Sequence, residues 1–390
     1  MPGPEGRLSA RAAQETGSEI RVIFELANEL EDVVRLEIGD PDFDTPGHVI
    51  DAAAEAAHGG ATHYTSTYGL PELRAAIAAK ARRDNDVPVE ADGVVVTNGG
   101  IEALALALLS VVEPGDEVVI PTPEWTNYAA QVSLAGGTPV RAPLDPENGF
   151  GLDPDTLTER FTTDTAAVLL CRPNNPTGRV YDEAAVRAVV EAAADQGVFV
   201  VADEVYERLT YTGSRRSAAA LGEPDHVLSV NSFSKGYAMT GWRLGWLAGP
   251  TDVIDAAQVV RQALTTCSSS VAQHAGLAAL RGPQEPYEAM VDTYARRRAF
   301  AVERVAEIPG LTCTEPEGAF YLFCALEGLD EPSMTVAKEL LTEYGVSVTP
   351  GSSFGDAGEG YLRLSYALDE ERLDIGLQRL EAYMRDAVRA

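Results

Sequence analysis

The sequence predicts an α/β protein, with a largely parallel, seven-stranded sheet in a large domain and a smaller α+β domain beside it. First, 390 residues are enough to bury a large core and to form two domains. Second, short apolar runs alternate with helical segments beyond Pro88, which is typical of a parallel sheet covered by helices. Third, glycines and polar side chains follow several of these runs, and ligands of such sheets bind at the carboxyl ends of strands.

Seven apolar runs are the candidate strands. They span 94–97, 118–121, 139–142, 167–172, 198–203, 227–231 and 243–248. Helical patterns lie before and between them, at 44–57, 102–112 and 182–196. These runs therefore account for the whole predicted sheet.

The acidic composition excludes several classes of function. The chain has 60 acidic and 30 basic residues, and the net charge of -30 is spread along its length, so the surface repels nucleic acid and anionic membranes. The sequence contains no run of eighteen apolar residues, so no membrane span is predicted. The first seventeen residues lack the apolar core of a signal peptide and are expected to form a flexible arm. We therefore expect a cytoplasmic protein.

The same charge indicates adaptation to salt. In dilute buffer so many like charges repel one another, but at about 1 M salt the Debye length falls to roughly 3 Å and this repulsion largely disappears. Lysine is also scarce, since only Lys80, Lys235 and Lys338 occur among the 30 basic residues. We predict a halophilic protein, and an ordinary acidic protein is the alternative.

The cysteines and histidines indicate neither a metal site nor a disulfide framework. The four cysteines form no CxxC pair, and they are Cys171, Cys267, Cys313 and Cys324. No HExxH motif is present, and His58 and His63 have the wrong spacing to share a helical face.

The stretch 226–249 draws attention to Lys235. An apolar run ends in Asn231, Ser232, Phe233 and Ser234 directly before this lysine, and Gly236 and Gly241 follow. The glycines would let an anion or a flat ring approach the backbone closely. A partly buried lysine can lose its proton near neutral pH and form a Schiff base, which arginine cannot. From this stretch alone, a surface lysine in a loop is the alternative.

Two further strand ends carry candidate ligands. Gly99 and Gly100 precede the helix at 102–112, where free backbone N–H groups and the helix dipole favour phosphate. Asp203 ends the apolar run at 198–203, and because an unpaired buried carboxylate costs several kcal/mol, it should have a cationic partner. A protonated pyridine nitrogen or a structural salt bridge would serve.

The segment SFSK followed by GWRLG resembles the lysine signature of class I pyridoxal-phosphate-dependent aminotransferases of fold type I, the aspartate and aromatic type. The resemblance extends from about Ser18 to the C-terminus. It rests on the order and approximate spacing of five residues, Asn175, Asp203, Tyr206, Lys235 and Arg243. It implies that pyridoxal 5′-phosphate is the cofactor and that seven strands form the large domain.

The resemblance implies a role for each candidate site residue. Lys235 would bind the cofactor aldehyde, Asp203 would face the ring nitrogen and Tyr206 would reach the ring hydroxyl. The other cofactor ligands would be Gly99, Gly100, Ile101, Trp125, Asn175, Ser232, Ser234, Arg243 and, from the neighbouring subunit of a homodimer, Tyr64. The substrate would contact Gly39, Trp125, Asn175 and Arg363, and Arg363 would grip its α-carboxylate. A turn glycine, a core tyrosine, a core tryptophan and a surface salt bridge are the alternatives at Gly39, Tyr64, Trp125 and Arg363.

The resemblance also implies the domain limits. Residues 1–17 would form an arm, 46–285 the large domain, and 18–45 with 286–390 the small domain. The small domain would include helices at 18–30, 284–305 and 336–343 and strands at 35–39, 317–323 and 361–366. The stripe of Ile20, Ile23, Ala27 and Leu30, with Phe24 beside it, is the apolar pattern of the first helix.

The expected activity is transfer of an amino group from an L-amino acid to a 2-oxo acid, which we expect to be 2-oxoglutarate. Members of the family selective for aspartate place a basic or hydroxyl residue where this chain has Ile101, so an aromatic, apolar or broad amino donor competes with aspartate. A carbon-sulfur β-lyase on the same fold is the alternative enzyme. A non-catalytic regulator is disfavoured because the chain lacks an added basic DNA-binding module.

Overall fold

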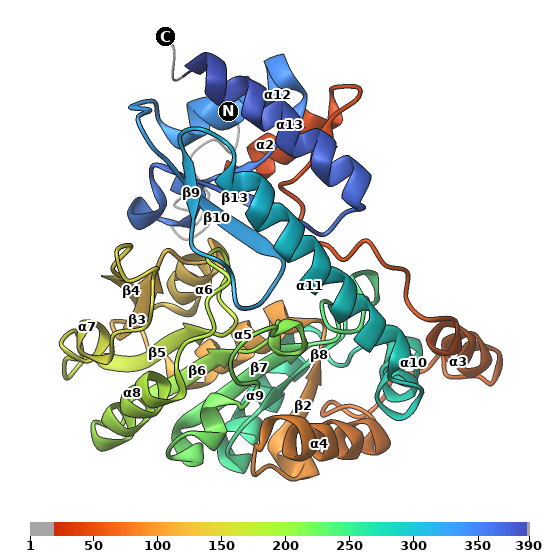
Figure 1. The fold of residues 1–390 in the computed structure, drawn as a ribbon. Coiled ribbons are helices and arrows are strands. Elements are labelled where there is room, and N and C mark those ends of the chain that lie inside the picture. Colours follow the sequence, from red (N-terminus) through yellow and green to blue (C-terminus); the bar gives the residue numbers. More distant parts are fainter. Residues whose placement is uncertain (1–18, 388–390) are drawn as a thin grey trace, which may run out of the picture.

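A computed structural model of the chain describes residues 19–387, and the predicted arm at 1–17 lies outside the described residues. The structure contains a seven-stranded sheet, a four-stranded sheet and a two-stranded sheet. In Figure 1 the large sheet lies at one end of the molecule and the two small sheets at the other.

The large sheet confirms all seven predicted strands. They are β2 (Val94–Thr97), β3 (Glu117–Thr122), β4 (Thr138–Pro143), β5 (Thr165–Cys171), β6 (Phe199–Asp203), β7 (Val227–Ser232) and β8 (Gly245–Ala248). Their order is β2-β8-β7-β6-β5-β3-β4, and only β8 runs antiparallel to its neighbours. The sheet is therefore largely parallel, as predicted.

Helices cover both faces of this sheet because its strands are apolar on both sides. In β5, Val168 and Leu170 pack on one face, while Ala167 and Leu169 pack on the other. The first face is covered by α3 (Gly47–His58), α4 (Pro71–Asn85), α7 (Pro154–Thr158), α8 (Glu183–Asp195) and α10 (Ser270–Arg281). The second is covered by α5 (Gly100–Val111), α6 (Asn127–Ala135) and α9 (Thr251–Leu264).

The four-stranded sheet and the paired strands share a third core. The strands are β9 (Leu311–Cys313), β10 (Tyr321–Leu326), β12 (Thr349–Pro350) and β13 (Tyr361–Ser365), with β1 (Val34–Arg35) paired to β11 (Val346–Ser347). The helices of this core are α2 (Glu19–Asn28), α11 (Glu285–Ala306), α12 (Ser333–Tyr344) and α13 (Glu370–Ala387). Figure 1 shows α11 running from these strands toward α10 and the large sheet.

Several sequence-based boundaries were wrong. The strand expected at 35–39 ends at Arg35. The strand expected at 243–248 begins at Gly245, because Arg243 turns the chain with a φ of 52°. The strand expected at 317–323 begins at Tyr321, since Ala319 also has a positive φ of 57°. Helix α2 ends at Asn28, so Leu30, a member of the predicted stripe, lies beyond the helix, and Phe24 is 43% exposed. The two positive-φ residues are unfavourable in a strand because their Cβ atoms crowd the backbone.

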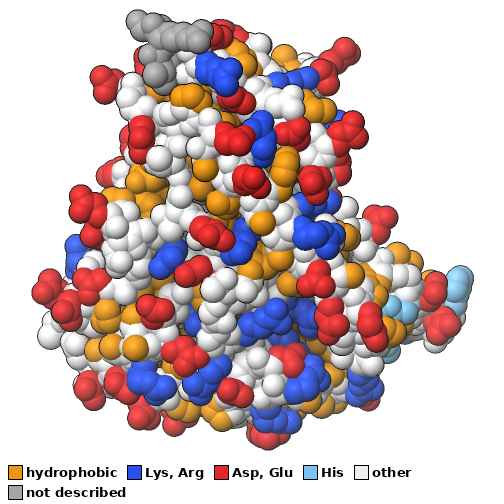
Figure 2. All heavy atoms as spheres, in the orientation of Figure 1, with side chains coloured by type: hydrophobic (Ala, Val, Ile, Leu, Met, Phe, Trp, Pro, Cys, Tyr) orange, Lys and Arg blue, Asp and Glu red, His pale blue; other side chains and the backbone are white. Residues whose placement is uncertain are grey.

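Acidic side chains are scattered over the face of the molecule seen in Figure 2, with basic side chains among them. Lys80 is buried and Lys235 is partly buried, so Lys338 is the only strongly exposed lysine of the chain. The basic groups on the described surface are therefore nearly all guanidinium groups.

Candidate active site

A cavity of about 470 Å³ lies between the carboxyl ends of the parallel strands and the β10–β13 sheet. It brings together twelve of the fourteen predicted site residues. These are Gly39, Gly100, Ile101, Trp125, Asn175, Asp203, Tyr206, Ser232, Ser234, Lys235, Arg243 and Arg363. Gly99 lies directly behind this lining, against Arg243, and Tyr64 lies outside it.

Lys235 follows β7, and its side chain points into the cavity, where the ammonium group donates a hydrogen bond to the backbone carbonyl of Gly39. Burial lowers the pKa of Lys235 to about 8, and the positive charges of Arg363 and Arg243 act in the same direction. A pKa in this range leaves an appreciable share of the amine unprotonated near neutral pH. This is the state in which an amine is a nucleophile or a base.

Gly39 must be a glycine for steric reasons. A Cβ atom built at this position would lie 2.2 Å from the Tyr321 hydroxyl oxygen. That hydroxyl lies 3.0 Å from the hydroxyl of Tyr206. The two phenols and the Gly39 carbonyl therefore form one wall of the cavity beside the Lys235 amine.

Asp203 ends β6 and is 4% exposed. The Tyr128 hydroxyl donates to its Oδ2 at 2.7 Å, and the Val205 N–H lies 3.3 Å from Oδ1. Burial raises the pKa of Asp203 to about 6, although these donors oppose the shift. No ion pair of the described residues includes Asp203, so the structural salt bridge considered from the sequence is absent there. A buried acid with neutral partners fits a protonated ring nitrogen as its counter-charge.

Two turns meet at the place where the glycines predict a phosphate site. Gly99, with a φ of 80°, caps the N-terminus of α5, and the Arg243 guanidinium occupies the space that a Cβ on Gly99 would need, at 2.9 Å. Ser232 and Ser234 lie beside it, their hydroxyl oxygens 2.8 Å apart. Helix dipole, hydroxyl groups and guanidinium together form an anion site.

A further glycine holds these turns close together. A Cβ on Gly245 would lie 2.6 Å from the Gly99 carbonyl carbon and 2.8 Å from the Gly100 nitrogen. Any larger residue at 245 would push the α5 N-terminus away from β8. The positive φ of Arg243 serves the same arrangement, because it turns the guanidinium back toward Gly99.

Arg363 on β13 is 3% exposed and makes no salt bridge among the described residues. Nη1 donates to Asn175 Oδ1 at 3.0 Å, Nη2 donates to the Glu37 carbonyl at 2.8 Å, and Nε has no partner. The guanidinium also lies 4.2 Å from the centre of the Tyr321 ring. A buried cation that is paired only with neutral groups is suited to bind a carboxylate.

Two aromatic residues of the predicted site, Trp125 and Tyr64, lie in different places. Trp125 lines the cavity and packs edge-on against Tyr128, with ring centres 5.4 Å apart. Tyr64 is 88% exposed and is no core tyrosine. Within one chain, then, Trp125 is placed to contact a flat ligand in the cavity and Tyr64 is not.

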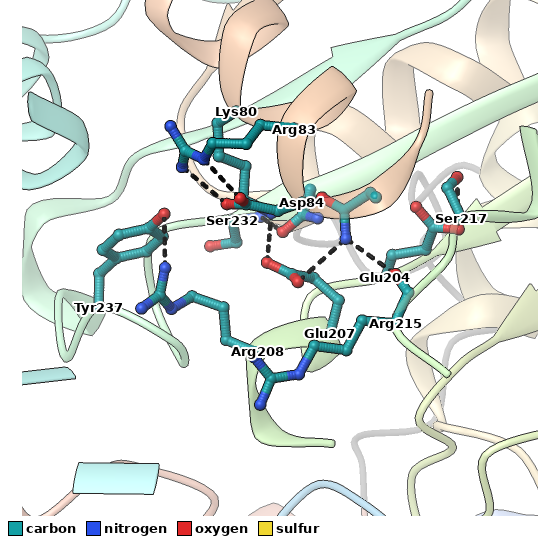
Figure 3. A network of polar contacts seen from close by, with 12 residues as sticks. Lys80, Arg83, Asp84, Glu204, Glu207, Arg208, Arg215, Ser217, Ser232 and Tyr237 are labelled. Atoms are coloured by element: carbon teal, nitrogen blue, oxygen red, sulfur yellow. Dashed lines mark hydrogen bonds and ion pairs between the residues drawn. The ribbon is translucent and has the colours of Figure 1, made fainter. Parts of the chain in front are cut away.

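A network of charged residues lies behind Tyr206, and Figure 3 shows it from close by. Lys80 on α4 is 1% exposed, and its Nζ lies 2.5 Å from Glu207 Oε1 and 2.6 Å from Asn85 Oδ1. The Asn85 amide donates to Glu207 Oε2 at 3.1 Å, which closes a triangle. Glu207 follows Tyr206 directly, so this triangle anchors the segment that carries the cavity phenol.

Sequence reasoning assigned no role to several residues of the site. Tyr128 was given no role from the sequence, yet it is the main hydrogen-bond donor to Asp203. Tyr321, Glu37 and Asp40 line the cavity and lie in segments with no local motif. The scarcity of lysine was the one signal that could have identified Lys80.

The described residues contain no cluster of three His, Cys, Asp or Glu side chains that could hold a metal ion. Within 19–387, every helix is too short or too polar to cross a lipid bilayer.

Comparison with known proteins agrees with this geometry. The family model for class I and II aminotransferases matches residues 31–380. The aspartate aminotransferase of Pyrococcus horikoshii is 38% identical over 366 residues, which cover 93% of this chain and 94% of that protein.

Two solved structures have the same fold. The aspartate aminotransferase of Thermus thermophilus with maleate has a TM-score of 0.92 at 39% identity, covering 98% of this chain and 100% of that chain. An aromatic aminotransferase from Pyrococcus horikoshii has a TM-score of 0.88 at 37% identity, covering 93% and 99%. The predicted fold and family are thus confirmed, and this chain belongs to the class I and II aminotransferases, enzymes that depend on pyridoxal phosphate.

Proposed function

We propose that this aminotransferase prefers amino donors with apolar or aromatic side chains and passes the amino group to a 2-oxo acid, 2-oxoglutarate being the expected acceptor. The observation that carries this proposal is the set of charges lining the cavity. The only basic residues that line it are Lys235, Arg243 and Arg363, and each would take part in binding the cofactor, in binding the α-carboxylate or in proton transfer. Among the described lining residues, no further basic group is left for a second carboxylate on the donor.

The roles of the three cations follow from their surroundings. Arg243 faces the glycine turn and the two serines and would hold the cofactor phosphate. Arg363 would bind the substrate α-carboxylate, which orients the Cα–H bond beside the Lys235 amine. Lys235 Nζ, with a pKa of about 8, can accept the Cα proton and release it again.

Pyridoxal phosphate, when bound, supplies an aldehyde that takes up the substrate amine and a ring that withdraws electrons from Cα. Asp203 would keep the ring nitrogen protonated. Asn175 and Tyr206 would donate to the ring hydroxyl, and Trp125 would cover the ring face. Tyr128, which also lines the cavity, donates to Asp203 and would support it in this role.

The entrance of the cavity supports the choice of donor. Ile20, Phe24, Ile38 and Ile101 line the cavity, and Asp40 is an acid beside them, whereas the Glu37 carboxylate is paired with Arg35. The Asp40 carboxylate would repel a side-chain carboxylate. 2-Oxoglutarate also carries a second carboxylate, but it lies one carbon farther from the α-carbon than the side-chain carboxylate of aspartate. It would therefore reach farther out of the cavity, toward a cation of a second subunit.

The domain limits stated above are part of the proposal. Most residues of the core shared by the small sheets come from 19–45 and 286–387, and most residues of the other two cores come from 46–285, although Tyr206 and Phe323 cross this division. This distribution supports a large domain at 46–285 and a small domain at 18–45 and 286–390. The cavity then lies between the two domains, with Lys235 on one side and Arg363 on the other.

We also propose a homodimer in which Tyr64 reaches the cofactor phosphate of the neighbouring subunit. Tyr64 is 88% exposed, and Val259 and Leu264 on α9 are 64% and 60% exposed. Gln258 on α9 donates to Thr67, so this helix lies next to the Tyr64 loop. The exposed apolar side chains around this loop fit an interface with a second copy. Light scattering that gave a stable monomer would contradict this.

The net charge and the scarcity of exposed lysine support a salt-adapted enzyme, which we place in the cytoplasm. Such a surface needs a medium rich in counter-ions.

A donor screen in high salt with 2-oxoglutarate as acceptor tests the proposed specificity. We expect phenylalanine, tyrosine or leucine to give a higher kcat/KM than aspartate. Ile101→Lys should raise the relative kcat/KM for aspartate, with Ile101→Leu as the matched control. Strict preference of the wild type for aspartate would contradict the reading of Ile101, and release of pyruvate from a sulfur amino acid without any acceptor would favour the β-lyase.

A further inference from the structure

Two of the four cysteines face each other across the edge of the four-stranded sheet. Cys313 on β9 is the register partner of Cys324 on β10. Paired residues of antiparallel strands point to the same face of a sheet. The spacing of these cysteines in the sequence did not predict that they pair, because the register of two strands is set only when the chain folds.

The backbone hydrogen bonds show which kind of pair this is. The Glu327 N–H donates to the Gly310 carbonyl, so 327 and 310 form a hydrogen-bonded pair in this register. Bonded and non-bonded pairs alternate along antiparallel strands, so Cys324 and Cys313 form a non-bonded pair. At such pairs the Cα atoms lie about 4.5 Å apart. This is within the range of about 4.4–6.8 Å found for disulfides.

The surroundings give the two thiols different access to solvent. Cys324 is fully buried in the core that the small sheets share with α11, whereas Cys313 lies on the edge strand and is partly exposed. A soluble reagent can therefore reach Cys313 first, with Cys324 directly behind it.

We propose that Cys313 and Cys324 are a site of reversible disulfide formation, with a low-molecular-weight disulfide as the oxidant. Disulfides are rare in reducing compartments, where those that form are usually transient. The site is independent of the transamination chemistry and of the donor specificity proposed above.

The exchange proceeds in two steps. The Cys313 thiolate attacks one sulfur of the small disulfide, forming a mixed disulfide and releasing one small thiolate. Cys324 then loses its proton and attacks Cys313 Sγ, expelling the second small thiolate. The two protein thiols are oxidised to one disulfide, and the small disulfide is reduced to two thiols. Contact between the thiols lowers the pKa of Cys313 and raises that of Cys324, which favours Cys313 as the first nucleophile.

The bond would tie the edge strand to a strand of the cavity wall. Tyr321 is on β10, and its neighbour Phe323 opposes Arg363 on β13. Opening of β9 away from β10 would be blocked in the oxidised form.

The test uses the native holoenzyme, incubated with oxidised glutathione, blocked with an alkylating agent and digested without reduction. We expect two of the four thiols to be lost, a cross-linked peptide pair containing Cys313 and Cys324, and full recovery with a thiol reductant. Cys267→Ser, which changes the other partly exposed cysteine, should give the same cross-link. Cys324→Ser should stop at the mixed disulfide on Cys313.

Two results would overturn the proposal. One is a folded enzyme that keeps all four thiols under conditions in which a small model dithiol is fully oxidised. The other is an oxidised protein whose cross-link joins other cysteines or two chains. Because the wild type is assayed directly, neither result depends on whether a variant folds.

Discussion

The buried pair of Lys80 and Glu207 allows a quantitative prediction of stability. Lys80→Met removes an ammonium group that makes two hydrogen bonds, at 2.5 and 2.6 Å, and keeps most of the side-chain volume. It leaves the Glu207 carboxylate 7% exposed, with only the Asn85 amide at 3.1 Å. Breaking a buried ion pair on one side costs about 3–5 kcal/mol, because the remaining charge has no partner. We expect a loss of that size in the free energy of unfolding.

The assay is urea denaturation at a fixed, high salt concentration, followed by fluorescence and by circular dichroism. Lys338→Met is the control, because Lys338 is exposed and makes no ion pair among the described residues; it should change the free energy of unfolding by less than about 0.5 kcal/mol. Lys80→Met with Glu207→Gln removes both charges and should recover most of the loss. If Lys80→Met were no more destabilising than Lys338→Met, the reasoning about the buried charge would be refuted.

Three further predictions concern the site and the surface. Asp203→Asn should stabilise the cofactor-free protein above pH 6, because the folded pKa of about 6 lies above the ordinary value of 3.8 and the buried charge costs stability there. The gain in the free energy of unfolding should vanish below about pH 4, where the acid is protonated in both the folded and the unfolded state. A gain that stayed constant from below pH 4 to above pH 6 in denaturation curves would contradict this prediction. Arg363→Lys should lower kcat/KM at least tenfold, since a lysine cannot replace the paired donors of a guanidinium. Arg379→Lys, at an exposed ion pair with Asp32, is the control and should have little effect on kcat/KM. Equal kinetic constants for the two variants would count against the binding of the substrate carboxylate by Arg363. Raising KCl from dilute buffer to about 2 M should raise the melting temperature and the activity, and indifference to salt would disprove halophilic adaptation.

The sheet was predictable because its strands are buried on both faces. Continuous apolar runs such as 167–172 and 198–203 then mark strands without any need to know their partners. Arg243 was placed in a strand by its apolar neighbours, but its left-handed conformation depends on contact with Gly99, which lies far away in the sequence.

Lys235, Asp203 and the glycines at 99 and 100 were predictable because they follow strand ends, whose positions in space are set by the parallel sheet. The other site residues were expected only from the resemblance to class I aminotransferases. Tyr321, Glu37 and Arg363 come from the part of the structure built on the small sheets, and their approach to Lys235 depends on how this part packs against the large sheet. The pairing of Cys313 with Cys324 likewise depends on the register of β9 against β10. Such contacts are long-range consequences of folding, and no local pattern encodes them.

The central claim is that the Lys235 amine is the group that binds the cofactor aldehyde, and the chain offers an unusually clear test of it. Only three lysines are present, of which one is buried in an ion pair and one is exposed far along the sequence on α12. The holoenzyme should be reduced with borohydride, digested and analysed by mass spectrometry. The account predicts a pyridoxyl group on Lys235 alone, whereas a label on Lys80 or Lys338, or no label on any lysine, would contradict it.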